Sequence, residues 1–334
     1  MVRIKIILLA GGQASRYNNV THQHSMIQPN DKLLSDRGNK YLIKFIVSEL
    51  CKLGEIIIVT RGEQRKQHYS TLLAQEIQNN SIQVIEEVFS NSIGPIGGIN
   101  SALRICDSSQ MVLILPTDLP NVTNEIIGIF IDNAMNAKSF DLVSLVHPNG
   151  QVENLVLAGY ANKIMKLSKS LIEANIYRVS SLYRLAQKKR FLNSLNIVTG
   201  INGKEAFKDL DFGDSTRELK AGTDMKEANI NQITNQYIDF GFNGFRYENQ
   251  SDPTFFFYQY LNWKINSYKK SSNAEIPALI TALINESEIY RSKGLYSLSL
   301  HCLLDAYKVA TDHSYPDQFT NLSVKIANLK KKLV

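Results

Sequence analysis

The chain has 334 residues, which is enough for two domains of ordinary size. Its hydrophobic share of 44% and charged share of 20% are typical of a soluble globular protein, and they exclude disorder, collagen and coiled coil as descriptions of the whole chain. The net charge of +6 suits a polyanionic small substrate as well as nucleic acid, so charge alone does not decide between them.

No apolar stretch reaches the roughly 18 residues that a membrane-spanning helix needs, so we expect no membrane segment. The apolar run at 4–10 leads into Gly11-Gly12 without a small-residue cleavage site, which favours a buried strand over a signal peptide. No Cys-x-x-Cys pair occurs, which argues against a zinc site or a disulfide framework, and the cysteines lie far apart, at Cys51, Cys106 and Cys302. We therefore expect a protein of the reducing cytoplasm.

Strands and helices alternate through the first 150 residues. Continuous apolar runs predict buried parallel strands at 4–10, 56–59, 82–86, 111–115 and 140–146. Helical stretches separate them, at 40–53, 63–79, about 95–106 and 123–137. This alternation predicts an α/β fold, a Rossmann-like and mostly parallel sheet with helices on both faces. Ligands of such sheets bind at the carboxyl ends of the strands, near the switch point.

From residue 150 to about 240 the pattern stays α/β but becomes less regular. We expect a strand at 154–160, helices at 162–173 and 178–189, and a strand at 195–199. The segment 241–250 is rich in Gly and Asn, as linkers often are. These features predict an α/β domain over residues 1–245 and a helical domain over residues 246–334.

The C-terminal region carries helix signals and no catalytic motif. Helix starts and stops are indicated at Asp252-Pro253, Pro277, Gly294 and Pro316. We expect a small all-helical bundle whose aromatic first helix, around 255–263, docks on the α/β domain. Its remaining apolar surface is a candidate for a protein partner or self-association. The run Lys330 to Lys332 fits a solvated helix end, so we expect no nucleic-acid partner.

The first strand ends in the motif Leu9-Ala10-Gly11-Gly12-Gln13-Ala14-Ser15-Arg16. Two glycines directly after a buried strand let the backbone approach a ligand, with amide groups free to bind phosphate oxygens. Arg16 adds a fixed positive charge for the same anion. The spacing matches neither the dinucleotide fingerprint nor a P-loop. A tight turn without a ligand is the alternative interpretation.

Three further motifs follow in chain order. They are a second glycine-rich turn, Gly94-Pro95-Ile96-Gly97-Gly98, a carboxylate at a strand end in Pro116-Thr117-Asp118-Leu119-Pro120, and Asn229-Ile230-Asn231 before a late helix. Together with the opening motif, this set resembles the nucleotidyltransferase family that includes molybdenum-cofactor guanylyltransferase. The resemblance covers about residues 3–240 and implies the nucleotide-diphospho-sugar transferase type of fold.

The resemblance also implies roles for the matched positions. Residues of the opening loop would wrap the triphosphate of GTP, namely Leu9, Ala10, Gly11, Gly12, Ser15 and Arg16. Lys32 would contact the phosphates, and Asp118 would hold Mg²⁺ with Asn229 and Asn231 nearby. The base would lie beside Gly94, Pro95 and Gly98. The candidate catalytic residues are then Arg16, Lys32 and Asp118.

The implied reaction is in-line attack by a phosphate of the acceptor on the α-phosphorus of GTP, with pyrophosphate leaving. Such chemistry needs positioning and charge neutralisation more than a covalent nucleophile. Magnesium prefers one or two carboxylates, with water and phosphate oxygens completing its octahedron. A lone carboxylate at Asp118 meets that requirement, and a helix cap is the alternative role for this residue.

The acceptor implied first is molybdopterin, a phosphorylated small molecule, and Glu153, Asn154 and Arg178 are candidates for its side of the site. Surface salt bridges are the alternative role for these three residues. Another acceptor, such as a cobinamide, sugar or lipid-precursor phosphate, stays open. Tyr17-Asn18-Asn19 and a long polar stretch separate Arg16 from Lys32, which favours a further alternative, a nucleotide-binding scaffold or regulator with weakened catalysis.

Overall fold

The computed structural model of the chain describes residues 4–11, 41–79, 82–89, 91, 93–137, 139–198, 207, 237–240, 252–266 and 275–333. The chain divides into two compact units, the first consisting mainly of residues up to Asn136 and the second mainly of residues from Ala137 onward. None of the helices in the described ranges is long and apolar enough to cross a membrane.

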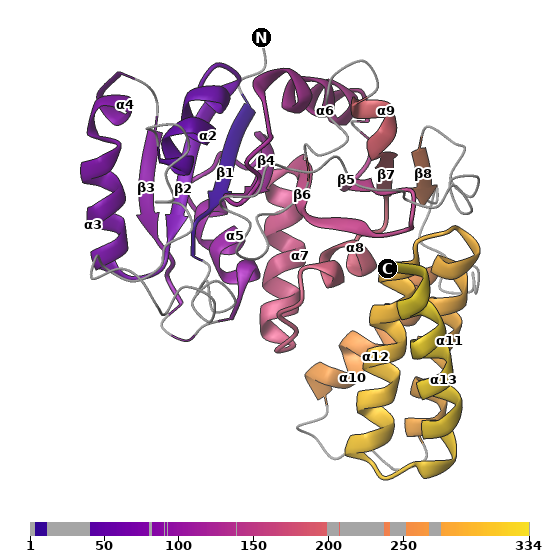
Figure 1. Cartoon of the computed structure of the whole chain (residues 1–334). Helices are drawn as coiled ribbons and strands as arrows, with labels where there is room; N and C mark the ends of the chain where they lie inside the picture. Colours follow the sequence, from indigo (N-terminus) through magenta and orange to yellow (C-terminus); the bar gives the residue numbers. More distant parts are fainter. Residues whose placement is uncertain are drawn as a thin grey trace, which may run out of the picture. The chain divides into compact units, whose positions relative to one another are not determined.

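The first unit is built on four parallel strands. They lie in the order β3-β2-β1-β4 and are β1 (Ile4–Leu9), β2 (Gly54–Thr60), β3 (Ile82–Glu86) and β4 (Met111–Pro116) (Figure 1). Ile6, Ile7 and Leu8 are all fully buried, as expected for a central parallel strand covered on both faces. Strands β2 and β3 lie on one side of β1, and β4 lies on its other side. The carboxyl ends of β1 and β4 therefore form a switch point.

The described helices of this unit are α2 (Leu42–Leu50), α3 (Glu63–Leu72), α4 (Ala74–Asn79), α5 (Pro95–Leu103) and α6 (Asn124–Asn136). Helix α2 buries Ile43, Ile46, Val47 and Leu50, the spacing of one apolar helix face. Helix α5 is buried over most of its length because it packs against β1 and β2.

The second unit contains β5 (Leu142–Val146), β6 (Val152–Tyr160), β7 (Lys189–Asn193) and β8 (Tyr237–Phe240), in the order β6-β5-β7-β8. The central pair, β5 and β7, is parallel, whereas β6 and β8 run antiparallel to their neighbours β5 and β7. Four of the six strand pairs described within the two units are therefore parallel. The expected α/β fold with a mostly parallel sheet is confirmed.

Seven described helices lie wholly or mostly in the second unit, and the last four form the helical bundle that the sequence predicts. The first three are α7 (Ala161–Glu173), α8 (Ser180–Leu185) and α9 (Ser194–Val198). The C-terminal bundle consists of α10 (Pro253–Asn266), α11 (Ile276–Ser292), α12 (Tyr296–Asp312) and α13 (Pro316–Leu333), each packed against the next (Figure 1). The start and stop signals are confirmed, because the Asp252 carboxylate accepts from Thr254 N at 2.9 Å and Gly294, at φ 77°, separates α11 from α12.

The C-terminal bundle docks on α8 and β7, as expected for its aromatic first helix. Thr254 Oγ1 of α10 donates to the carbonyl of Ala186 at 3.2 Å. Arg184 of α8 forms ion pairs with Glu286 of α11 and Asp305 of α12. By packing, the bundle thus belongs to the second unit. The division of the chain near residue 245 stays a prediction.

The sequence-based assignment of residues 178–199 is wrong in two places. The helix expected at 178–189 ends at Leu185, and β7 already begins at Lys189. The strand expected at 195–199 is instead helix α9. The pair Lys189-Arg190 resembles the polar end of a helix, which explains the wrong assignment. In the structure Lys189 is buried, and its ammonium group donates to the carbonyl of Tyr183 at 2.8 Å and to the Tyr290 hydroxyl at 2.9 Å.

The short edge strand β8 has no counterpart among the expected elements. Its Asp239 holds Arg190 of β7 through two hydrogen bonds of 2.7 Å, and the Arg190 guanidinium lies over the ring of Tyr237 at 4.1 Å. The pairing between β7 and β8 depends on residues about fifty positions apart, so a local sequence pattern could not reveal it.

Candidate functional site

The carboxyl ends of β1 and β4 bring the opening motif and the Asp-x-Pro motif to the same edge of the first unit. Leu9 pairs with Pro116 in the register of the two strands. Thr117 is buried and donates from Oγ1 to the carbonyl of Leu9 at 3.0 Å, which ties the two chain segments together just beyond the strands. Gly11 and Asp118 therefore both lie at the switch point, where α/β sheets bind ligands.

The second glycine-rich motif forms the start of α5. Gly94 is the N-cap residue, with φ 69°, and Pro95 is the first helical residue. Gly98 packs against β1 and β2, since a Cβ built there would lie 3.2 Å from the Leu9 side chain and 3.6 Å from that of Val59. Gly94, Pro95 and Gly98 thus lie beside the carboxyl ends of the same strands. The N-terminus of such a helix carries unpaired amide donors and a partial positive charge.

Glu87 is a further candidate that the sequence reasoning missed. It follows β3 directly, and its backbone N–H donates to the carbonyl of Thr60 at 2.9 Å. Its Oε1 is buried and has no hydrogen-bond partner among the described residues, and it lies 2.0 Å from where a Cβ of Gly97 would be. Burial raises the pKa of the Glu87 carboxyl, and the positive charge of Arg61 opposes this rise. The sequence did contain a signal for Glu87, because this carboxylate directly follows a predicted buried strand and lies seven residues before Gly94.

Two arginines also lie at this edge, after β2 and in α3. A Cβ at Gly11 would lie 3.7 Å from Cβ of Arg61, so this arginine stands next to the opening motif. Arg65 approaches the same motif, with Nη1 at 3.5 Å from the carbonyl of Ala10. The edge therefore combines backbone amides, two guanidinium groups and two carboxylates, which are the group types that bind a nucleotide and a hard cation.

Several positions named from the sequence lie outside the described residues. They are Gly12, Ser15, Arg16, Lys32, Asn229 and Asn231. Their assignment to phosphate and metal stays a prediction.

The candidates for the acceptor side lie in the second unit. Glu153 and Asn154 are neighbours in β6, and Oε2 of Glu153 lies 3.5 Å from Nε2 of His147. The other ring nitrogen of His147, Nδ1, is 3.2 Å from Oγ of Ser194. The Tyr183 hydroxyl donates to the carbonyl of Asn154 at 2.9 Å. His147 and Ser194 thus join the predicted pair in one polar group at the ends of β5 and β7.

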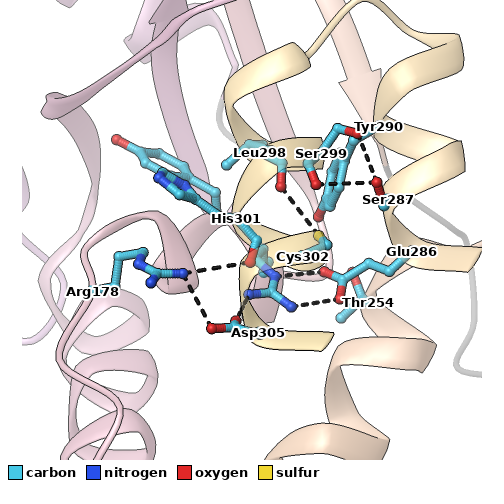
Figure 2. Close-up of polar contacts among 12 residues, drawn as sticks. Arg178, Thr254, Glu286, Ser287, Tyr290, Leu298, Ser299, His301, Cys302 and Asp305 are labelled. Atoms are coloured by element: carbon cyan, nitrogen blue, oxygen red, sulfur yellow. Dashed lines mark hydrogen bonds and ion pairs between the residues drawn. The ribbon is translucent and has the colours of Figure 1, made fainter. Parts of the chain in front are cut away.

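Arg178 lies against the C-terminal bundle. Its guanidinium contacts Asp305 of α12 at 3.2 Å and the carbonyl of His301 at 3.5 Å (Figure 2). The contact with Asp305 is the salt bridge that was the alternative role for this residue. A role in acceptor binding stays a prediction for Arg178.

A family model described as the MobA-like NTP transferase domain matches residues 6–189, which is more than half of the chain. The chain belongs to this family. The match includes Gly11 and Asp118, and, of the polar group in the second unit, His147, Glu153 and Asn154 but not Ser194.

Two relatives of this MobA-like chain bear the name "Probable molybdenum cofactor guanylyltransferase". The protein from Bacillus mycoides is 28% identical over 168 residues, which are 50% of this chain and 72% of the relative. The protein from Bacillus cereus is 26% identical over the same shares of the two chains. Among solved structures, a nucleotidyl transferase from Methanothermobacter thermautotroptrophicus matches with a TM-score of 0.38 and 16% identity, over 50% of this chain and 76% of that one.

Proposed function

We propose that this member of the MobA-like NTP transferase family transfers GMP from GTP to molybdopterin and releases pyrophosphate, with Mg²⁺ as cofactor. The observation that carries the proposal is the meeting of Gly11 and Asp118 at the switch point of the first unit. The names of the two Bacillus relatives support GTP and molybdopterin as the substrates.

In the proposed reaction an oxygen of the acceptor phosphate attacks the α-phosphorus of GTP. The bond from the α-phosphorus to the bridging oxygen breaks, and pyrophosphate leaves with its electron pair. The backbone after β1 would bind the triphosphate, and Arg16 and Lys32 would neutralise its charge. Arg61, beside Gly11, is a further cation for the same purpose. Positioning and charge neutralisation of this kind supply most of the catalysis in phosphoryl-type transfers.

The described residues of the site fit magnesium. No group of three or more His, Cys, Asp or Glu side chains gathers within the described ranges, and a protein-only cage is not what magnesium needs. Asp118 offers one hard carboxylate at the strand end, and phosphate oxygens of the nucleotide would supply further ligands. When bound, the ion would polarise the phosphates and stabilise the charge that develops on the leaving pyrophosphate.

Glu87 favours guanine as the base. Guanine presents two adjacent donors, N1–H and the 2-amino group, to which one carboxylate can accept two hydrogen bonds, whereas the matching edge of adenine offers an acceptor at N1. The buried Oε1 of Glu87 lacks a partner among the described residues, and leaving such an acceptor unpaired costs free energy. A guanine beside Gly97 and Gly98 would provide that partner if the Glu87 carboxyl group turned toward the base.

Pyrophosphate release with each of the four nucleoside triphosphates, with and without molybdopterin, tests the proposal. We expect turnover with GTP and molybdopterin, and greater thermal protection by GTP than by ATP, because only a ligand that binds the native state stabilises it. Glu87→Gln should weaken GTP binding by about tenfold or more, since one acceptor becomes a donor. The exposed neighbour Glu86 offers the matched control, Glu86→Gln.

Each alternative has its own result in this experiment. Turnover with another phosphorylated molecule, and not with molybdopterin, would show that this other molecule is the acceptor. Tight GTP binding without turnover on any acceptor would favour the nucleotide-binding scaffold. Equal thermal shifts for all four nucleotides would refute guanine specificity.

A further inference from the structure

The turn between β5 and β6 packs directly against the backbone of the C-terminal bundle. Within the turn, the backbone N–H of His147 donates to the carbonyl of Gln151 at 2.8 Å, and that of Gly150 donates to the carbonyl of His147 at 2.8 Å. Gly150 adopts φ 80°, which favours glycine. A Cβ at Gly150 would lie only 2.2 Å from the carbonyl oxygen of Gly294 in the α11–α12 turn. The two backbones therefore meet where no side chain fits.

Hydrogen bonds fix this contact from both sides. The N–H of Ser297, in the first turn of α12, donates to the carbonyl of Gly150 at 3.2 Å. The Ser297 hydroxyl accepts from the N–H of Val152 at 2.9 Å in a buried position. At the other end of the bundle's chain, Asn149 Nδ2 donates to the carbonyl of Leu333 in α13 at 3.2 Å. The start of α12 and the end of α13 thus both hold this one short turn.

The bundle itself is anchored to the strand next to this hairpin. Lys189, the first residue of β7, is buried and donates to Thr254 of α10 at 3.1 Å and to Tyr290 of α11 at 2.9 Å. Strand β7 pairs with β5 and ends next to Ser194, the hydrogen-bond partner of His147. The bundle therefore contacts both β7 and the turn that follows β5, and it can fix the relative positions of the two.

We propose that Gly150 and Ser297 are positioning residues, through which the C-terminal bundle holds His147 and Glu153 in the geometry that binds the acceptor. The proposal rests on the proposed function, because it takes Glu153 and Asn154 as the acceptor side of a nucleotidyltransferase. His147 and Glu153 flank the turn, at its first residue and at the residue after Val152, so a shift of the turn moves both side chains. Misplacement of a substrate-positioning group by about 1 Å can reduce the rate at low substrate concentration, kcat/KM, by up to about 10²-fold.

The test compares Gly150→Ala with the wild-type full chain. The methyl group must displace the turn from Gly294, so the KM for molybdopterin should rise by about tenfold or more, with the kcat and the affinity for GTP changed by less than about twofold. Hydrogen exchange of the backbone amides at 147–153 should become faster. A general loss of stability would not produce this split between the two substrates.

Further variants separate the contact from other effects of substitution. Ser297→Ala removes the hydroxyl that accepts from Val152 and should act like Gly150→Ala, whereas Ser297→Thr keeps a hydroxyl and should recover part of the lost acceptor affinity. Gly62 has a similar φ of 83°, and a Cβ added there would meet nothing within 4 Å, so Gly62→Ala controls for backbone strain in thermal unfolding. Gly128→Ala, whose Cβ would meet its nearest atom at 3.9 Å, is the neutral control for activity.

Two results would overturn the proposal. One is an unchanged acceptor KM in a Gly150→Ala protein whose turn exchanges faster, and the other is unchanged exchange at 147–153 in both Gly150→Ala and Ser297→Ala. A wild-type protein that transfers no nucleotide would overturn the proposed function instead. In that case faster hydrogen exchange at 147–153 in the variants would still indicate that the bundle stabilises this turn.

Discussion

Arg184 of α8 and Glu286 of α11 form a fully buried, bidentate ion pair. Nε of Arg184 donates to Oε1 of Glu286, and Nη2 of Arg184 donates to Oε2, both at 2.7 Å. Both side chains are 0% exposed. Asp305 of α12 contacts the same guanidinium, so one arginine of α8 joins two helices of the C-terminal bundle. The ring of Phe257 covers the guanidinium at 4.3 Å and completes the enclosure.

Glu286→Gln should lower the free energy of unfolding by about 3 kcal/mol or more, because it removes one charge from a buried pair and leaves Arg184 undercompensated. Urea unfolding of the variant and the wild type measures the difference. Glu288, on the same helix, pairs with Arg291 at the surface, so Glu288→Gln should cost only about 0–1 kcal/mol. Similar decreases in the free energy of unfolding for both variants would show that the buried ion pair does not contribute more to stability than the surface pair.

Stability should fall on acidification because of His301. Burial, helped by the charges of Arg178 and Arg184, lowers the pKa of His301 to about 4. In the unfolded chain this ring takes up its proton near its usual pKa of about 6.5, so the unfolded state binds more protons between the two values. The wild type should therefore lose up to about 3 kcal/mol relative to His301→Gln as the pH falls from about 6.5 to about 4.

Titration of the His301 ring by NMR provides a direct measurement of the same effect. A ring that titrates close to pH 6.5 in the folded protein would contradict the expectation. So would a stability difference between the wild type and His301→Gln that does not change with pH over this range.

Asp118→Asn should reduce the rate of pyrophosphate release by about 10²-fold or more while the protein stays folded, because it removes a formal charge where the cation would bind. Initial rates at several magnesium concentrations, together with a thermal unfolding curve, test this. Asp132 is exposed on α6, and Asp132→Asn should leave the rate unchanged. Wild-type turnover by a folded Asp118→Asn protein would remove Asp118 from the site.

A chain that ends at residue 248 should lose solubility and the cooperative unfolding of the second unit. The cut leaves Arg184 without Glu286 and Asp305, and Lys189 without Thr254 and Tyr290, so two buried cations lose their partners. GTP binding should persist in whatever fraction stays folded, because the Gly11 and Asp118 edge belongs to the first unit.

A chain that ends at residue 314 is the matched control for this truncation. It lacks α13 but keeps every one of those four partners, so it should stay folded. Comparison of the two truncations by size-exclusion chromatography and by GTP affinity decides the matter. Loss of GTP affinity in a folded chain ending at 248 would mean that the bundle contributes to the nucleotide site.

The alternation of apolar runs and helical stretches was enough to predict the α/β fold, the parallel strands of the first unit and the bundle of helices at the end of the chain. It also placed Gly11 and Asp118 at strand ends. These features depend on spacing within short segments, because the burial of a strand or of one helix face follows from the pattern of neighbouring residues.

The tertiary structure alone decided the features that depend on partners far away in the chain. Lys189 begins a strand because Tyr183, Thr254 and Tyr290 surround its ammonium group. Glu87 is a candidate for the site because its carboxyl group lies against Gly97 of α5. The contact of Gly150 with Gly294 joins residues that are far apart in sequence. A buried charge or a backbone without room for a methyl group is stable only when its partners are in place, and sequence spacing does not encode which distant residues those partners are.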